Sequence, residues 1–187
     1  MKRNLFLIGT SIILLSGCSF FGTGEKEATI PVAAPEALQA EAKMTNTEGN
    51  EVGVVKFTEG DEGVLVSLNL TNVPDGKHGL HIHTVGKCEQ PTFESAGAHF
   101  NPANKKHGIE NPEGPHAGDL PNVNAENGQV VTEFVAKGIT LEQGMANSIF
   151  DEDGSAIVLH ENVDDYKTDP TGNSGARIAC GVITPIE

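Results

Sequence analysis

The sequence is short of basic residues. It has 12 Lys and Arg against 26 Asp and Glu, which gives a formal net charge of −14 at pH 7. Nucleic acids are polyanions, and their binding sites usually neutralise phosphates with lysine and arginine. The shortage of positive charge therefore argues against a nucleic-acid partner and against electrostatic adhesion to anionic lipid.

The sequence also lacks an apolar run long enough to span a bilayer comfortably. The stretch from Leu5 to Leu15 follows Lys2 and Arg3, and a spanning helix needs about 20 apolar residues. A charged start and a short apolar stretch are typical of an export signal. The run Leu15-Ser16-Gly17-Cys18 then resembles a bacterial lipobox, in which the cysteine is lipidated and becomes the mature N-terminus. We expect a lipoprotein signal peptide over residues 1–17, with an ordinary cleaved signal peptide as the alternative.

Lipidation of Cys18 would determine where the protein resides. Removal of residues 1–17 takes away two basic residues and no acid, which leaves a net charge of −16. Several acyl chains on Cys18 would nevertheless hold the protein stably at a membrane. The expected location is outside the cytoplasm, lipid-anchored to the outer face of the bacterial cell membrane. Residues 18–36, with the lipidated Cys18, show no clear period and are expected to form a flexible tether. Residues 37–187 would form one domain with a sizeable core.

Cysteine is scarce, with three residues in the chain. If Cys18 takes lipid, Cys88 and Cys180 remain as a pair, and an exported compartment permits a disulfide between them. The bond would close a loop of about 92 residues and stabilise the fold by about 4–5 kcal/mol in the chain-entropy model. Two buried free thiols are the alternative.

Long amphipathic helical runs and internal repeats are absent as well. Apolar residues instead alternate from Leu38 to Met44 and from Val64 to Leu70, as they do in half-buried strands. Val52 and Val54 are expected on one strand face. Short strands separated by turn signals predict an antiparallel sandwich or barrel. Two long stretches, 84–122 and 161–176, lack a strand pattern, and loops of such length are usually functional or disordered. The histidines in the first of them favour function.

All seven histidines lie between residues 78 and 160. Neutral imidazole is a common metal ligand, and residues i and i+2 of a strand share a face, so His81 and His83 can reach one ion. One set could supply four nitrogens in the tetragonal arrangement that favours copper(II): His81, His83, His99 and His160. A second set could supply three nitrogens and one oxygen to a tetrahedral ion such as zinc: His99, His107, His116 and Asp119. His99 belongs to both sets and could bridge two ions.

The chain resembles the copper/zinc superoxide dismutases over essentially the whole of residues 37–187. The motifs that carry the resemblance are His78-Gly79-Leu80-His81-Ile82-His83, Gly97-Ala98-His99-Phe100-Asn101-Pro102, Lys106-His107-Gly108, His116-Ala117-Gly118-Asp119, Leu159-His160-Glu161 and Gly172-Asn173-Ser174-Gly175-Ala176-Arg177 through Cys180. The resemblance implies an all-β fold, a Greek-key β-barrel or sandwich of eight antiparallel strands with two long functional loops.

The resemblance also assigns roles to individual residues. It implies one copper per subunit on the four-histidine set and one zinc per subunit on the second set, with Cys88–Cys180 as an intrasubunit disulfide. Arg177 would attract and orient superoxide beside the copper, a task that suits a planar, permanently charged guanidinium. Asp164 would link a copper histidine to a zinc histidine. His78 would be a buried structural residue, and Thr171 would narrow the channel.

The implied reaction is the dismutation of superoxide to oxygen and hydrogen peroxide, with His99 as the catalytic bridge that takes up and returns a proton. An exported enzyme of this kind would protect against extracellular superoxide. Two rivals stay open: a catalytically silent protein for copper and zinc storage or delivery, and a structural zinc module. The short 161–176 loop holds one lysine, Lys167, so Arg177 is expected to dominate substrate steering. A homodimer is compatible with the resemblance, but bacterial and eukaryotic members differ in their dimer contacts.

Overall fold

The computed structural model describes residues 36–186 and shows an all-β architecture. Its elements are the strands β1 (Gln39–Asn46), β2 (Glu51–Gly60), β3 (Gly63–Thr71), β4 (Gly76–His78), β5 (Leu80–His83), β6 (Val123–Ala125), β7 (Gln129–Ala136), β8 (Ala156–His160) and β9 (Arg177–Pro185), with one 3₁₀ turn, η1 (Glu94–Ala96). Within residues 36–186, no helix is long and apolar enough to cross a membrane. The expected signal peptide, Cys18 and the tether up to residue 35 lie outside the described residues.

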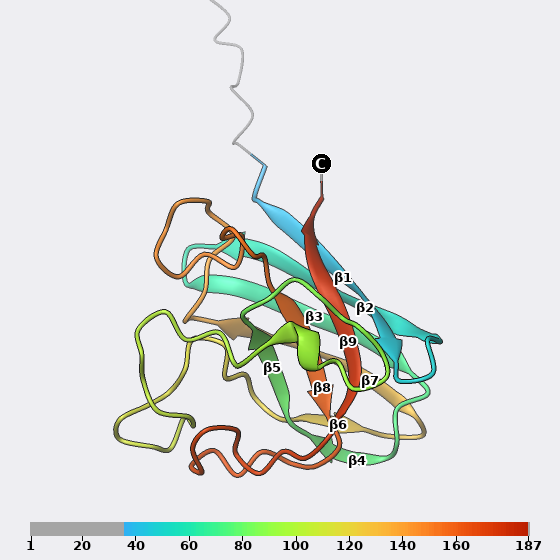
Figure 1. The fold of residues 1–187 in the computed structure, drawn as a ribbon. Coiled ribbons are helices and arrows are strands. Elements are labelled where there is room, and N and C mark those ends of the chain that lie inside the picture. Colours follow the sequence, from blue (N-terminus) through green and yellow to red (C-terminus); the bar gives the residue numbers. More distant parts are fainter. Residues whose placement is uncertain (1–35, 187) are drawn as a thin grey trace, which may run out of the picture. The chain divides into compact units, whose positions relative to one another are not determined.

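Seven strands form one antiparallel sheet in the order β5-β8-β9-β1-β2-β3-β7, and the sheet curls around the core (Figure 1). β4 pairs with β6. The chain passes from β4 to β5 through Gly79. It passes from β6 to β7 through a turn at Asn127 and Gly128, two residues with positive φ. The β4–β6 pair therefore connects the two edges of the curled sheet. If β4 and β5 are counted as one strand that changes partner, the described residues form eight strands. The predicted barrel-like fold is therefore confirmed.

Alternation along β5 places the candidate ligands on the outer face of the sheet. Leu80 and Ile82 are fully buried in the main core, while His81 and His83 point to the opposite face and are also buried. A strand that is buried on both faces needs a second covering layer, which here comes from the long loops of residues 84–122 and 161–176 (Figure 1). The core side chains anchor this strand, because burying one such side chain contributes about 1.5–3 kcal/mol.

The expectation that Val52 and Val54 share a strand face is wrong. Val52 is buried with Val55, whereas Val54 lies on the more exposed side. The pairing of β1 with β2 shifts between Met44 and Thr45, and the extra residue of a bulge reverses the alternation. Gly53 sits at this bulge with φ 136°, and a Cβ there would clash with the Asn69 carbonyl oxygen. The sequence pattern alone does not reveal such a bulge.

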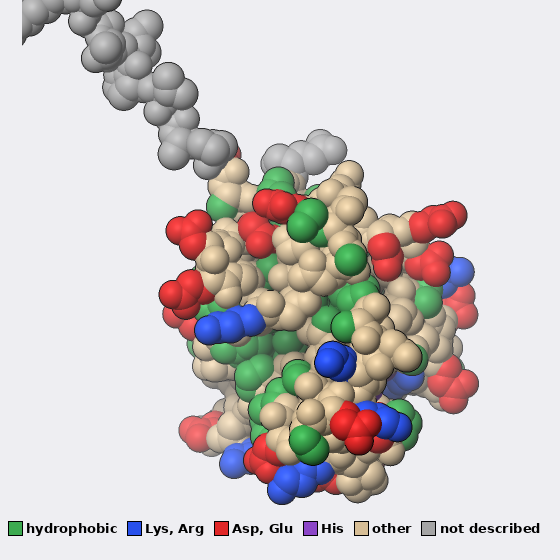
Figure 2. All heavy atoms as spheres, turned by 90° about the vertical axis from the view of Figure 1, so that its left-hand side faces the viewer, with side chains coloured by type: hydrophobic (Ala, Val, Ile, Leu, Met, Phe, Trp, Pro, Cys, Tyr) green, Lys and Arg blue, Asp and Glu red, His purple; other side chains and the backbone are tan. Residues whose placement is uncertain are grey.

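The loops and their side chains dominate one face of the molecule. Figure 2 shows acidic side chains spread mainly around its periphery, with apolar side chains gathered towards its centre. All seven histidines are buried. The candidate ligands are therefore covered by the rest of the chain.

Candidate metal centre

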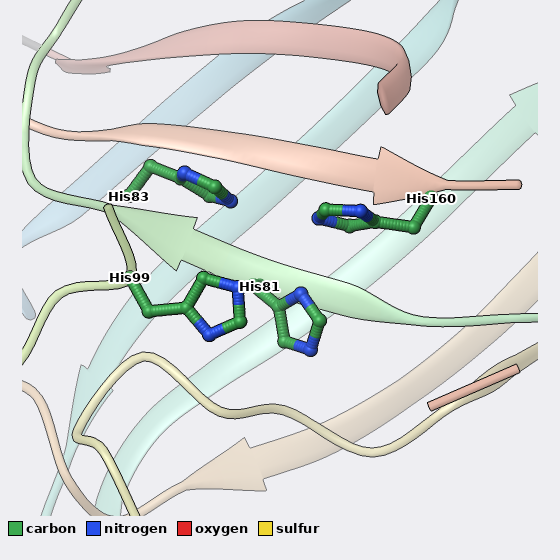
Figure 3. A group of neighbouring side chains, drawn as sticks. All are labelled: His81, His83, His99 and His160. Carbon is green, nitrogen blue, oxygen red and sulfur yellow. The ribbon is translucent and has the colours of Figure 1, made fainter. Parts of the chain in front are cut away.

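Two adjacent strands and one loop bring four histidines together. His81 and His83 come from β5, His160 ends the neighbouring strand β8, and His99 follows η1 and forms an isolated bridge with His83. Their rings converge on one point (Figure 3). One nitrogen of each ring lies within 4.8 Å of the corresponding nitrogens of the others. This is the set for which copper was predicted.

Hydrogen bonds fix which nitrogen of each ring carries the proton. His83 Nδ1 lies 2.9 Å from the Gly97 carbonyl oxygen, and His160 Nδ1 lies 3.3 Å from that of Gly175. A carbonyl only accepts, so Nδ1 is the donor in both rings and Nε2 keeps its lone pair. Among the described residues, four buried nitrogens of this set have no hydrogen-bond partner: His81 Nδ1, His83 Nε2, His99 Nε2 and His160 Nε2. Buried polar atoms are rarely left unpaired, so these nitrogens fit a metal ion.

Burial also keeps these rings neutral. Desolvation, with the neighbouring histidines, lowers the pKa of His83 to about 2 and that of His160 to about 3. Desolvation lowers the pKa of His99 to about 4 despite its hydrogen bond with Asp119, and it lowers the pKa of His81 as well. The rings therefore offer lone pairs at neutral pH without first losing a proton.

The second set gathers around one carboxylate oxygen. Asp119 Oδ1 lies 3.0 Å from His99 Nδ1, 3.0 Å from His107 Nδ1 and 3.2 Å from His116 Nδ1. Its other oxygen accepts the backbone N–H groups of Gly108 and His116. Burial acts to raise the pKa of Asp119, but the three nearby rings, that of His107 most of all, outweigh burial and hold this pKa far below its usual range. Three nitrogens and one anionic oxygen are a donor set that suits zinc.

The distances between candidate ligand atoms do not by themselves select the four predicted zinc ligands. His81, rather than His116, falls within 4.8 Å of His99, His107 and Asp119. However, His81 donates Nε2–H to Asp164, 2.6 Å away, and its Nδ1 faces the four-histidine set. His81 thus has no nitrogen left for a second ion. His116 remains the fourth ligand that the chemistry favours.

Asp164 contacts one histidine of each set. Its Oδ2 accepts from His81 Nε2 at 2.6 Å, and its Oδ1 accepts from His107 Nε2 at 3.1 Å. Burial opposes ionisation, but these two hydrogen bonds keep the pKa of Asp164 below its usual range. Burial likewise acts to lower the pKa of His107, yet the neighbouring carboxylates of Asp119 and Asp164 raise it to about 9.

Asn122 holds Asp164 in place, and this role was not predicted from the sequence. The Asn122 side chain donates to the Asp164 carbonyl at 2.9 Å and accepts from the Asp164 N–H at 2.8 Å. The hydroxyl of Tyr166 accepts the Asn122 N–H at 2.7 Å. These contacts join residues 42 and 44 positions apart, so no local spacing could have shown them.

Arg177 lies beside the metal candidates. A cavity of about 730 Å³ is lined by His99, Thr171 and Arg177 together with apolar residues such as Phe100 and Pro102. Lys167 is not among the lining residues, and its ammonium pairs with Glu110 at 2.8 Å on the surface. Among the lining residues, Arg177 carries the permanent positive charge, and Asp151 is the acidic residue.

Three other predicted residues can be placed. The Cys88–Cys180 disulfide is present, which confirms that prediction and fastens the 84–97 segment to β9. His78 lies outside both donor sets, because its ring nitrogens each lie 2.8 Å from a carbonyl oxygen, of His160 and Pro74.

A Greek-key barrel with a four-nitrogen set and a three-nitrogen, one-oxygen set sharing a single histidine defines a two-metal protein. The family model for copper/zinc superoxide dismutase (SODC) matches residues 51–183. The chain belongs to the copper/zinc superoxide dismutase family. Copper and zinc are the metals of that family, and the two donor sets fit them.

Individual relatives agree with this assignment. The chain is 47% identical to superoxide dismutase [Cu-Zn] 2 of Aquifex aeolicus over 156 residues, which cover 82% of this chain and 91% of the relative. It is 40% identical to the superoxide dismutase-like protein YojM of Bacillus subtilis, over 98% of this chain and 96% of that protein. A crystal structure of a SOD-like protein from Bacillus subtilis matches with a TM-score of 0.73 at 46% identity, covering 75% of this chain and 95% of that one.

Proposed function

We propose that this protein dismutates superoxide, converting two superoxide ions and two protons to oxygen and hydrogen peroxide. The observation that carries the proposal is the convergence of four buried, neutral histidine nitrogens beside a cavity that Arg177 lines. Copper bound by those nitrogens would supply the one-electron redox chemistry. Zinc would be held by His99, His107, His116 and Asp119.

The protein's own residues would bind the substrate and handle a proton. Each terminal nitrogen of Arg177 donates one hydrogen bond to a backbone carbonyl. A guanidinium has five N–H donors, so three remain for a small anion. Apolar walls at Phe100 and Pro102 lower the local dielectric and strengthen that attraction. His99 holds Nδ1 towards Asp119, so Nε2 is the atom at which this ring can take up and release a proton.

A catalytically silent metal-binding protein is the second candidate, and the comparisons give it a specific basis. The Bacillus subtilis relative that spans nearly the whole chain is called superoxide dismutase-like. A structural neighbour at 47% identity and TM-score 0.74, over 75% of this chain and 94% of its own, is a double mutant of a SOD-like protein with a tyrosine and a proline changed to histidine. In this chain all six ligand histidines are present without engineering. Filled ligand positions favour the enzyme.

One assay separates the two candidates. The purified protein is loaded with copper and zinc, its metal content is measured, and superoxide decay is followed against a His160→Gln variant. The enzyme predicts fast decay with the wild type and a loss of at least about a hundredfold with the variant. Full metal occupancy with no acceleration of decay would instead establish the silent protein.

The proposed enzyme is exported, tethered through lipid on Cys18, and protective against superoxide outside the cell. The lipobox-like run at residues 15–18 supports this, and so does the disulfide, since disulfides persist mainly in oxidising compartments. Cell fractionation tests the tether: the wild type should stay with membranes, and Cys18→Ala should leave them. A knockout with unchanged sensitivity to extracellular superoxide would contradict the protective role. Sedimentation of the purified protein would show whether it forms a homodimer.

A further inference from the structure

Phe93 is a buried aromatic residue in the segment between Cys88 and His99, immediately before η1. Its side chain is fully buried in a small cluster on the outer side of β8 and β9, with Ala96, Val158 and Cys180 among its members. Its φ is 55°, a left-handed conformation that bulky residues seldom adopt. An apolar side chain is therefore held firmly at a backbone position of unusual geometry.

The two ends of η1 hold the Arg177 guanidinium. At one end the Phe93 carbonyl accepts from Arg177 Nη1 at 2.6 Å, and at the other the Gly97 carbonyl accepts from Nη2 at 2.7 Å. The Gly97 carbonyl also accepts from His83 Nδ1. The orientation of one short turn thus determines where the guanidinium lies and how a candidate copper ligand is held.

A three-residue turn needs anchoring from outside, because so short a helix is not stable alone. The disulfide lies five residues before Phe93, so it fastens the segment without fixing this carbonyl. Backbone bonds from Phe93 N to Glu89 O and from Ala96 N to Phe93 O close the local turn. The Ala96 carbonyl accepts from the Val85 N–H, and Ala96 packs in the same cluster. Phe93 carries the largest side chain of that cluster, and its ring packs the residue whose carbonyl holds Arg177 against β8 and β9.

We propose that Phe93 is a positioning residue for Arg177. Its buried ring fixes η1 so that the Phe93 and Gly97 carbonyls hold the guanidinium at the cavity. The catalytic importance of this contact rests on the proposed function, whereas the contact itself can be measured without turnover or metal.

The test compares Phe93→Ala with Val158→Ala, which removes side-chain volume from the same buried cluster but leaves the residue that accepts from Arg177. The first readout is ¹⁵N NMR of the metal-free protein, in which hydrogen-bonded Arg177 Nη–H groups give resolved, slowly exchanging signals. The second is the affinity of the copper- and zinc-loaded protein for azide, a small monovalent anion, followed by absorbance. Phe93→Ala should lose the Arg177 signals and bind azide about five- to tenfold more weakly, the effect of losing a charge-assisted hydrogen bond. Val158→Ala should resemble the wild type in both.

Two further variants make the result specific. If Phe93 acts through Arg177, Phe93→Ala should cost no further azide affinity in an Arg177→Lys background. Should Phe93→Ala fail to fold, Phe93→Leu decides, with an expected two- to threefold loss of azide affinity and partial loss of the Arg177 signals. Wild-type behaviour of the deciding variant, or an equal loss in Val158→Ala, would overturn the proposal. Neither readout measures turnover, so a wild type without dismutase activity would overturn the proposed function alone.

Discussion

Asp119 Oδ1 lies 3.0 Å from Nδ1 of His99, while Nε2 of the same ring is one of the four unpartnered nitrogens that converge with those of His81, His83 and His160. This places His99 between the two donor sets, with one nitrogen for each. A substitution of Asp119 should therefore change metal binding at both sets.

We expect Asp119→Asn to weaken zinc binding by at least about a hundredfold, because it removes the anionic ligand of the set. It should also alter the electron paramagnetic resonance spectrum of bound copper through His99. Titration against a chelator measures the zinc affinity. Asp153→Asn, at an exposed carboxylate, is the control and should change neither. An unaltered copper spectrum in Asp119→Asn would contradict the shared role of His99.

Asp164→Asn should weaken binding at both sets by about ten- to a hundredfold, since the carboxylate fixes the rings of His81 and His107 and such outer contacts tune affinity to that extent. The copper and zinc affinities are measured separately by chelator competition. A loss confined to zinc would show that the His81 contact does not matter for copper.

Arg177→Ala should reduce the dismutation rate constant by about tenfold or more, whereas Lys167→Ala should stay within about twofold. Arg177 lines the cavity, and Lys167 forms an exposed ion pair with Glu110. Rates measured over a range of ionic strength should lose their salt dependence mainly in Arg177→Ala. Equal, small losses in both variants would remove Arg177 from substrate steering.

The metal-free protein should lose stability as the pH falls below 6.5. His83, His99 and His160 have pKa values of about 2, 4 and 3 in the fold, below the ordinary 6.5. Unfolding then takes up protons, which lowers the free energy of unfolding between pH 6.5 and 4 by about 1 kcal/mol per pH unit for each proton.

His107 acts in the other direction. Its pKa of about 9 contributes stability that is complete below pH 6.5 and is lost as the pH rises towards 9. Urea unfolding in EDTA at pH 4.5, 6.5 and 9 should therefore give the highest midpoint at pH 6.5. A midpoint that rises from pH 6.5 to 4.5 would show that the three buried rings are protonated in the fold.

Much of this arrangement could be predicted because it follows local rules. The i, i+2 spacing of His81 and His83 places both on one strand face, and the Asn127-Gly128 pair forms the positive-φ turn between β6 and β7. The contacts of Phe93 and Asn122 could not be predicted. Phe93 contacts Arg177 through its backbone carbonyl, across 84 positions of sequence. Every residue has a backbone carbonyl, so the residue type does not show which one will accept from Arg177.

If the four-histidine set and Arg177 together form a dismutase site, the fully loaded protein must accelerate the decay of superoxide. We expect a second-order rate constant at least about a hundredfold above that of the His160→Gln variant with equal zinc content. If superoxide decays no faster with the loaded wild type than with His160→Gln, the assignment of a dismutase site is contradicted.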